Sequence, residues 1–286
     1  YKAIFGYGMA GASRVSMSNL VNSSGVVATD VTGVGSARNQ LAAAKYGLDK
    51  AIFGYGSTGS YTAITNLVSN SGVIATDVSG VGTVRNTLAA AGYGGDKAIF
   101  GYGQAGSDLS MTNLVNSSGV VAADVTGVGT ARNSLAATGY GGDKAIFGYG
   151  RQPSVLSITN LVTNVGVVGT DVTGVGTARF SLAATVYGTD KAIFAYGYTT
   201  GYVSMSNLVS NSGVVAADVT GVGSVHDGLA AAGYGGDKAI FGYGGTTPGH
   251  TSITNLVSNS GVIATDVSGV GTARTTLAAA GYSLSA

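Results

Sequence analysis

Residues 131–150 read ARNSLAATGYGGDKAIFGYG, and a closely similar stretch recurs throughout the chain. Within it, residues 135–140 and 144–150 are short runs of small, β-branched and aromatic residues, separated by the turn-forming residues GGD. Short runs bounded by Gly and Asp are typical of β-strands joined in a hairpin. No apolar period of 3.6 residues extends over ten or more residues, so we expect strands and no helices.

The repeat occurs six times in the 286 residues, at intervals of 47 or 48. The string KAIF begins at Lys2, Lys50, Lys97, Lys144, Lys191 and Lys238. Each copy also carries Asn before LV, an Asp in the segment GVVATDV, and a Tyr that ends LAAAGY. Because six copies account for the whole chain, we predict a single domain over residues 1–286.

Each unit is predicted to contain four short strands, LAAAGY, KAIFGYG, SMTNLV and GVVATDV, and four strands in 40 to 50 residues are typical of a propeller blade. The first unit lacks its LAAAGY strand, and the end of the chain supplies one. Blade one would comprise residues 2–8, 15–21 and 26–32, closed by residues 275–282. We therefore predict an all-β, six-bladed β-propeller with four antiparallel strands per blade and a first blade closed by the C-terminal strand. A linear solenoid would need atypical capping repeats, and the sequence has none.

Composition excludes several classes of protein and partner. The formal net charge of +1 gives no electrostatic footprint for nucleic acid, and the absence of Cys removes disulfides and thiolate zinc sites. No apolar run approaches the roughly 18 residues of a membrane helix, so we expect no membrane partner. We expect a monomer, and the sequence assigns no compartment.

The run that begins at Ala131, followed by a variable loop and S-M-T-N-LV, resembles a unit of the kelch-repeat propellers. The shared features are the Arg before the inner strand, the turn, and the glycine-ended second strand. The sequence departs from kelch units in carrying GYG in place of a glycine pair, and in lacking the Tyr and Trp of the outer strands. The resemblance implies an interaction scaffold rather than an enzyme. The near-identical units are also similar to repeats of phage and metagenomic proteins and to symmetric designed propellers.

Motifs for catalysis or cofactor binding are nearly absent. GxGxxG occurs at Gly6, Gly8 and Gly11, but a dinucleotide site needs a following helix, whereas another short strand is predicted. His226 and His250 have no motif partners. Eleven of the 13 Asp fall at two repeated positions, which suits structural residues better than catalytic ones. We predict a protein without enzymatic activity, cofactor or metal.

One repeated position, just before the inner strand, carries cations and is the first candidate site. Its residues are Arg38, Arg85, Arg132, Arg179, His226 and Arg274. A ring of guanidinium groups at one channel mouth would bind an anionic small molecule or an acidic peptide, and the kelch resemblance implies that arginines at this position line such a pocket. Alternatively, each Arg pairs structurally with the Asp eight residues earlier, as Arg85 would with Asp77, and both roles can coexist. Because His226 interrupts the set, we expect the fifth unit to be the weakest sector.

The segments between KAIFGYG and SMTNLV are the second candidate site, because they vary while the rest repeats. In a propeller they share a face with the arginine position. Tyr61, Arg151, Tyr198 and Tyr202 lie in them, and loops rich in Tyr, Ser and Gly are typical of adaptable binding surfaces. The alternative function is therefore a glycan-binding module of the phage or viral receptor-contact type. The variation is also consistent with drift at tolerant loop tips, or with an engineered scaffold without a ligand.

Overall fold

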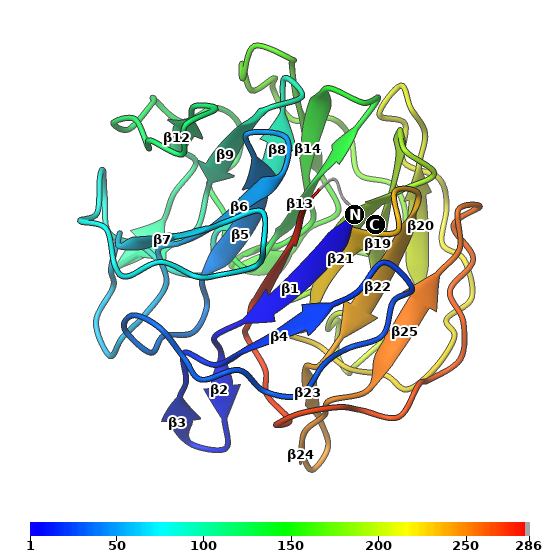
Figure 1. The fold of residues 1–286 in the computed structure, drawn as a ribbon. Helices are drawn as coiled ribbons and strands as arrows, with labels where there is room; N and C mark the ends of the chain where they lie inside the picture. The colour runs from blue at the N-terminus through cyan, green and yellow to red at the C-terminus, as the bar shows by residue number, and fades with distance from the viewer. Residues whose placement is uncertain (284–286) are drawn as a thin grey trace.

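The computed structural model describes residues 1–283, and within this range all regular secondary structure is β-strand (Figure 1). Each of six units contributes one inner, one middle and one outer strand. The inner strands are β5 (Ala42–Tyr46), β8 (Ala89–Tyr93), β13 (Ala136–Tyr140), β18 (Ala183–Tyr187), β21 (Ala230–Tyr234) and β26 (Ala278–Tyr282). The middle strands are β1 (Lys2–Gly6), β6 (Lys50–Gly54), β9 (Lys97–Gly101), β14 (Lys144–Gly148), β19 (Lys191–Ala195) and β22 (Lys238–Gly242). The outer strands are β4 (Ser18–Val21), β7 (Thr65–Val68), β12 (Thr112–Val115), β17 (Thr159–Val162), β20 (Ser206–Val209) and β25 (Thr254–Val257).

Every unit forms a three-stranded antiparallel sheet, in which the middle strand pairs with the other two. In the first unit, the inner strand comes from the far end of the chain. β26 pairs with β1 from Lys2 opposite Tyr282 to Gly6 opposite Ala278, so the red and blue strands of Figure 1 belong to one sheet. This pairing confirms that the C-terminal strand completes the first unit.

Main-chain hydrogen bonds join each unit to the next at both ends of the inner strands. At one end, the residue two positions before each inner strand has a φ of 51–56° and donates its N–H to the carbonyl of its counterpart in the preceding unit, at 2.7–2.9 Å. We call these residues the axial belt: Gln40, Thr87, Ser134, Ser181, Gly228 and Thr276. At the other end, hairpin N–H groups donate to the next unit, from Gly47 to Asp96 O and, at the closure, from Ser283 to Asp49 O. The six sheets thus follow one another in a ring, an arrangement compatible with a propeller.

The predicted fourth strand of each unit is not formed as a strand. The backbone pairing of residues 26–32 of the first unit with β4 is limited to two isolated bridges, Val27 with Val21 and Val31 with Ser18. Between these two bridges the outer segment advances by four residues, from Val27 to Val31, while β4 advances by three, from Ser18 to Val21. One extra residue on one side of a strand pair is the geometry of a β-bulge. The Asn19 side chain donates to Ala28 O and to Asp30 Oδ1, so a side chain replaces part of the ladder. The prediction of four strands per unit was therefore wrong by one, and the other strands are shorter than predicted.

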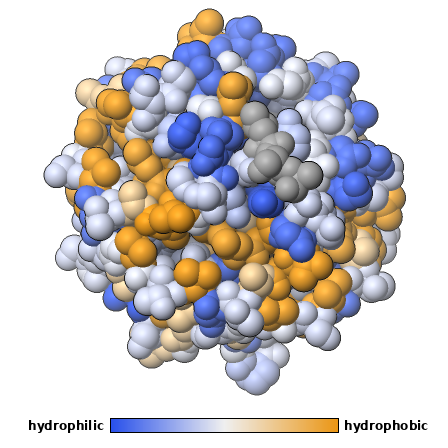
Figure 2. All heavy atoms as spheres, in the orientation of Figure 1, coloured by the Kyte–Doolittle hydropathy of each residue, from blue (hydrophilic) through white to orange (hydrophobic). Residues whose placement is uncertain are grey.

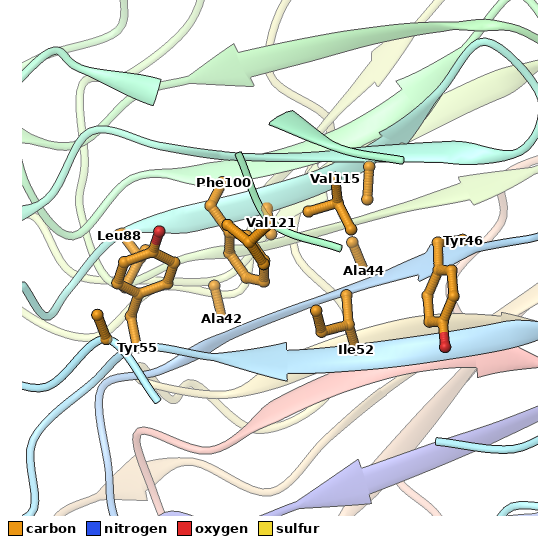
Figure 3. Packing of buried hydrophobic residues seen from close by; sticks show 12 residues of the cluster. Ala42, Ala44, Tyr46, Ile52, Tyr55, Leu88, Phe100, Val115 and Val121 are labelled. Atoms are coloured by element: carbon orange, nitrogen blue, oxygen red, sulfur yellow. The ribbon is translucent and has the colours of Figure 1, made fainter. Parts of the chain in front are cut away.

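The hydrophobic core lies between neighbouring sheets. Figure 3 shows one such interface, where Ala42, Ile52 and Tyr55 of the second unit pack against Leu88 and Phe100 of the third. At each interface the Tyr of GYG meets the Phe of the next unit's KAIF, with ring centroids 5.0–5.4 Å apart. Such pairs are worth about 0.5–1.5 kcal/mol beyond their buried area. Six equivalent pairs therefore stabilise the contacts around the ring.

At one equivalent position of the outer segment, the valine of each unit is largely exposed. These residues are Val26, Val73, Val120, Val167, Val214 and Val262, each 60–65% exposed. Apolar residues accordingly appear among polar ones on the face drawn in Figure 2. Among residues 1–283, no helix is long and apolar enough to cross a membrane.

Candidate functional site

The segment that enters each inner strand, which we call the connector, lies beside the variable loop of the same sheet. Isolated bridges join Asn39 to Ser57 and Asn133 to Arg151, and Phe180 to Tyr198. The end of the ring that carries connectors and variable loops is called the loop face below, and the opposite end, which carries the inner-to-middle turns, the hairpin face. The arginine position and the variable loops therefore share one face, as predicted.

Four of the six variable loops form short hairpins on the loop face. These are β2 (Met9–Ala10) with β3 (Ser13–Arg14), β10 (Gln104–Ala105) with β11 (Ser107–Asp108), β15 (Arg151–Gln152) with β16 (Ser154–Val155), and β23 (Gly245–Thr246) with β24 (Gly249–His250). The loops of the second and fifth units instead close through single bridges, Ser57 with Tyr61 and Tyr198 with Tyr202. The fold therefore presents six loops of different shape on equivalent supports.

Arg132 shows how the repeated arginines are held. Its side chain is 0% exposed, and its guanidinium lies 4.3 Å from the ring centre of Tyr102 in the preceding unit. Nε donates to Tyr149 O at 2.8 Å and Nη2 to Asn160 Oδ1 at 2.8 Å, both in the following sheet. Nη1 donates to Thr130 O of its own connector at 3.1 Å. Arg132 therefore ties two neighbouring units together through protein acceptors.

The other arginines repeat these contacts. Arg38, Arg85, Arg179 and Arg274 are also fully buried, each with its guanidinium 4.2–4.4 Å from a Tyr ring centre and with Nη2 bonded to an Asn. At Arg274 the Nε atom finds no partner within residues 1–283. The arginines thus occupy equivalent positions around the ring, as predicted. Their guanidinium N–H groups, however, point into the interfaces between sheets.

Each Arg lies closest to an Asp of the following unit rather than to the Asp eight residues before it. Arg38 Nη1 is 4.0 Å from Asp77 Oδ1, and Arg274 Nη1 is 3.7 Å from Asp30 Oδ1 across the ring closure. The predicted partner of Arg85 was Asp77, whereas the carboxylate that interacts with Arg85 is that of Asp124. The structural hypothesis therefore had the right residue types and the wrong pairs, because the connector carries each Arg onto the next sheet.

The repeated carboxylates hold the connectors through hydrogen bonds. Asp171 accepts from Thr130 Oγ1 at 2.6 Å, from Thr130 N at 3.1 Å and from Asn160 Nδ2 at 2.9 Å. Burial alone would raise the pKa of Asp171, but these hydrogen bonds and the nearby Arg132 charge hold it below its ordinary value. Gly129 completes the cradle, since at its φ of +73° an added Cβ would collide with the Asp171 carboxylate. The same direction of pKa shift applies to Asp30, Asp77, Asp124, Asp218 and Asp266.

These lowered pKa values predict acid sensitivity. A carboxyl group whose pKa is depressed on folding stabilises the fold fully above its unfolded pKa of about 3.9, and this contribution is lost as the pH falls through the folded value. Asp171→Asn should therefore be clearly less stable than the wild type in urea unfolding at pH 7. The difference should shrink steadily below about pH 4, where the wild-type carboxylate is itself protonated. A difference that stays constant down to pH 2.5 would contradict this assignment.

His226 occupies the arginine position in the connector after the fifth unit and fills it incompletely. Its Nδ1 lies 2.6 Å from Tyr243 O, where an Arg would place Nε, so Nδ1 carries the ring hydrogen. Within residues 1–283, His226 Nε2 and Asn255 Oδ1 are buried without a hydrogen-bond partner. Burial lowers the pKa of His226 and so favours the neutral form of the ring. The fifth-to-sixth interface thus lacks the contacts that the guanidinium makes elsewhere, in line with the expected weak sector.

Asp227, next to His226, is a second departure from the repeat. Three other units carry Asn at this position, namely Asn39, Asn86 and Asn133. Burial raises the pKa of Asp227 to about 6. The connector of this sector therefore holds a desolvated carboxyl group beside a desolvated imidazole.

An aromatic cluster on the loop face brings together three of the predicted loop residues. Tyr198 lies 5.3 Å from Tyr202 and 5.5 Å from Phe180 between ring centroids, and Arg151 Cζ lies 4.6 Å from the Phe180 ring centre. The three aromatic residues are half-buried and Arg151 is exposed. Sequence reasoning missed Phe180, although it is the one aromatic residue at a position where other units carry Asn, Asp or Thr. Tyr61 lies in the loop of the second unit and is 39% exposed.

A cavity of about 410 Å³ lies between the inner strands and opens toward the hairpin face. Its wall includes inner-strand residues from all six units, among them Ala43, Lys45 and Gly139. No residue of the axial belt and none of the repeated arginines lines it. The cavity is therefore at the end of the ring opposite to the predicted anion pocket.

Comparison of the chain with protein-family models gives no match, and comparison with curated proteins gives none either. Within residues 1–283, no group of three or more His, Cys, Asp or Glu side chains is placed to hold a metal ion. The class of protein defined by fold and site is thus a ring of six antiparallel sheets with repeated buried ion networks. The features that differ between units are the variable loops, the aromatic cluster, the connector at His226, and Lys45.

Proposed function

We propose that the chain is a six-bladed, kelch-like β-propeller that acts as a rigid, non-enzymatic binding scaffold. The interlocked buried arginines and the hydrogen bonds at both ends of the inner strands support this proposal. Such contacts hold a frame in one shape, on which loops of different sequence are displayed. Binding residues are often found on loops that a rigid frame positions.

The proposed binding surface is the aromatic cluster of Arg151, Phe180, Tyr198 and Tyr202, and the proposed ligand class is carbohydrate. The single observation that carries this proposal is that three aromatic rings meet at one sector of the loop face. Aromatic rings offer apolar faces to the C–H groups of a sugar, while the Tyr hydroxyls and a guanidinium offer polar partners. The cluster thus combines the two kinds of contact that a sugar ring needs.

The arginine position is a weaker candidate for the ligand site than the aromatic cluster. An anion there would have to displace the carbonyl and Asn acceptors that already receive the guanidinium hydrogen bonds. It would also have to enter a fully buried site. We therefore assign the repeated arginines to the frame and the exposed Arg151 to the binding surface.

The carbohydrate proposal predicts that the effect of mutation is confined to one sector. Replacement of Tyr198 and Tyr202 together by Ala should weaken binding of the best-bound oligosaccharide at least about tenfold, equivalent to roughly 1.4 kcal/mol. Tyr61→Ala, in another sector of the same face, should change the affinity less than twofold. Binding would be measured by calorimetry after screening a panel of immobilised oligosaccharides. If no oligosaccharide binds, carbohydrate is excluded as the ligand class. If the double variant binds as the wild type does, the aromatic cluster is excluded as the binding surface.

A further inference from the structure

Only the second unit carries a charged residue in its inner strand, and the inner strands of the other five units carry none. At the fourth position of the inner strand, the other units carry Gly92, Gly139, Val186, Gly233 and Gly281. The second unit carries Lys45, which lines the axial cavity. Glycine suits this position because neighbouring inner strands pass closely. An added Cβ on Gly92 would lie 3.3 Å from Lys45 O. The long cationic side chain of Lys45 therefore departs from the small or apolar residues that the other units carry at this position.

Lys45 is a cation without a carboxylate partner in the part of the chain that the structure describes. The nearest candidate, Asp49, already binds Lys50 Nζ at 3.2 Å and Asn70 Nδ2 at 3.2 Å. The Lys45 ammonium instead lies 5.1 Å from the ring centre of Tyr1. Desolvation lowers the pKa of Lys45 against the opposing attraction of Asp49, since the half-buried ammonium has lost part of its hydration. An anion in the cavity would compensate this charge.

Most other lysines at the cavity rim already have partners. Lys97, Lys144 and Lys238 each pair with the preceding Asp at 3.0–3.2 Å. Lys2 differs, because Tyr1 rather than Asp precedes it and it forms no ion pair within residues 1–283. Among the described residues, the uncompensated positive charge of the cavity is therefore concentrated on the side of Lys45 and Lys2.

The wall of the cavity favours a small organic anion. Every inner strand is the edge of its sheet, so main-chain N–H and C=O groups of its free edge face the axis. Alanine methyl groups such as those of Ala43 and Ala137 lie between them. A volume of about 410 Å³ accommodates a molecule of a few carbon atoms with its hydration. Inorganic phosphate would lose more hydration energy in such a partly apolar wall than a monovalent carboxylate would.

We propose that the axial cavity binds a small organic monocarboxylate, whose carboxylate group pairs with the Lys45 ammonium. The polar substituents of the ligand, such as a hydroxyl group, meet the free edges of the inner strands. This site lies on the hairpin face and is independent of the carbohydrate surface proposed for the loop face.

The test uses lactate as the probe, with inorganic phosphate as the competing anion class. Lactate should bind the wild type saturably, with Lys45 shifted in a ¹⁵N or ¹³C NMR titration. Lys45→Gly should lose at least about tenfold in affinity and should fold normally, because Gly is the residue of four other units at this position. Tighter binding of phosphate than of lactate would overturn the assignment to carboxylates.

Two further variants separate the site from a general charge effect. Lys191→Ala removes a hairpin-face cation that does not line the cavity, and its lactate affinity should stay within about threefold of the wild type. Gly233→Lys in the Lys45→Gly background returns a cation to an equivalent position, where an added Cβ has 3.6 Å to its nearest neighbour. Lactate binding should recover in this double variant. Absence of saturable lactate binding to the wild type, or unchanged binding to Lys45→Gly, would disprove the proposal.

Discussion

Replacement of Arg132 by Ala is expected to lower the free energy of unfolding by about 3–5 kcal/mol, the range observed when one partner of a buried ionic network is removed. The substitution leaves Tyr149 O, Thr130 O and Asn160 Oδ1 without their donor. Each buried acceptor left unpaired costs about 1–3 kcal/mol before relaxation. The Tyr102 ring also loses the cation that packs against its face.

Urea unfolding at pH 7 followed by Tyr fluorescence would measure this effect. Arg151→Ala is the matched control, since Arg151 is exposed and should change the stability by less than about 0.5 kcal/mol. Arg132→His should fall between the wild type and the Ala variant, because His226 shows that an imidazole retains the contact to the Tyr carbonyl. A loss below about 1 kcal/mol in Arg132→Ala would show that the guanidinium network contributes little to the fold.

Replacement of His226 by Arg is expected to stabilise the protein by about 1–3 kcal/mol, the cost of the unpaired buried groups that it would satisfy. The new Nη2 would donate to Asn255 Oδ1, as Arg132 does to Asn160. It would also provide a cation near Asp266, the counterpart of Asp171. The other units thus supply the residue that we expect to strengthen the fifth-to-sixth interface.

The gain from His226→Arg should grow as the pH falls. A His whose pKa is lower in the folded than in the unfolded state does not reduce the free energy of unfolding above the unfolded pKa of about 6.5. As the pH falls from there through the folded pKa, the free energy of unfolding decreases. The Arg variant has no such loss, so the difference between the two proteins should be larger at pH 5.5 than at pH 7.5. His250→Arg on the variable loop β24 is the control. Equal stability of His226→Arg and the wild type at both pH values would refute the account of this sector.

The repeat pattern was sufficient to predict strands at LAAAGY, KAIFGYG and SMTNLV, although each is shorter in the structure, because each is a run of strand-forming residues between turn residues. It was also sufficient to predict that the C-terminal strand pairs with the first, since Lys2 begins a unit whose inner strand is missing. Residues 26–32 were predicted as a strand from the same kind of composition. They do not form one, because the Asn19 side chain and an extra residue disrupt the ladder. A bulge depends on the register between two segments, which composition does not encode.

The candidate site, too, was only partly predictable from the sequence. Residue types and repeat positions identified the Arg and Asp of each unit as a set, and the variable loops as neighbours of the arginines. The partner of each Arg, and its burial, follow from how one sheet lies on the next, because the contacts join residues about 39 positions apart or across the ring closure.

The sequence alone was sufficient to predict six equivalent β-units in which the few charged residues occupy fixed positions of the repeat. Composition and periodicity are enough for this, because they describe the residues within one unit. Whether a given charge faces solvent, a ligand or another unit is a property of the packed ring, because burial and electrostatic partners arise only where units meet. The tertiary structure accordingly assigned the repeated arginines to the interfaces and gathered Phe180 with Tyr198 and Tyr202. It also placed Lys45 in the axial cavity without a carboxylate partner among residues 1–283.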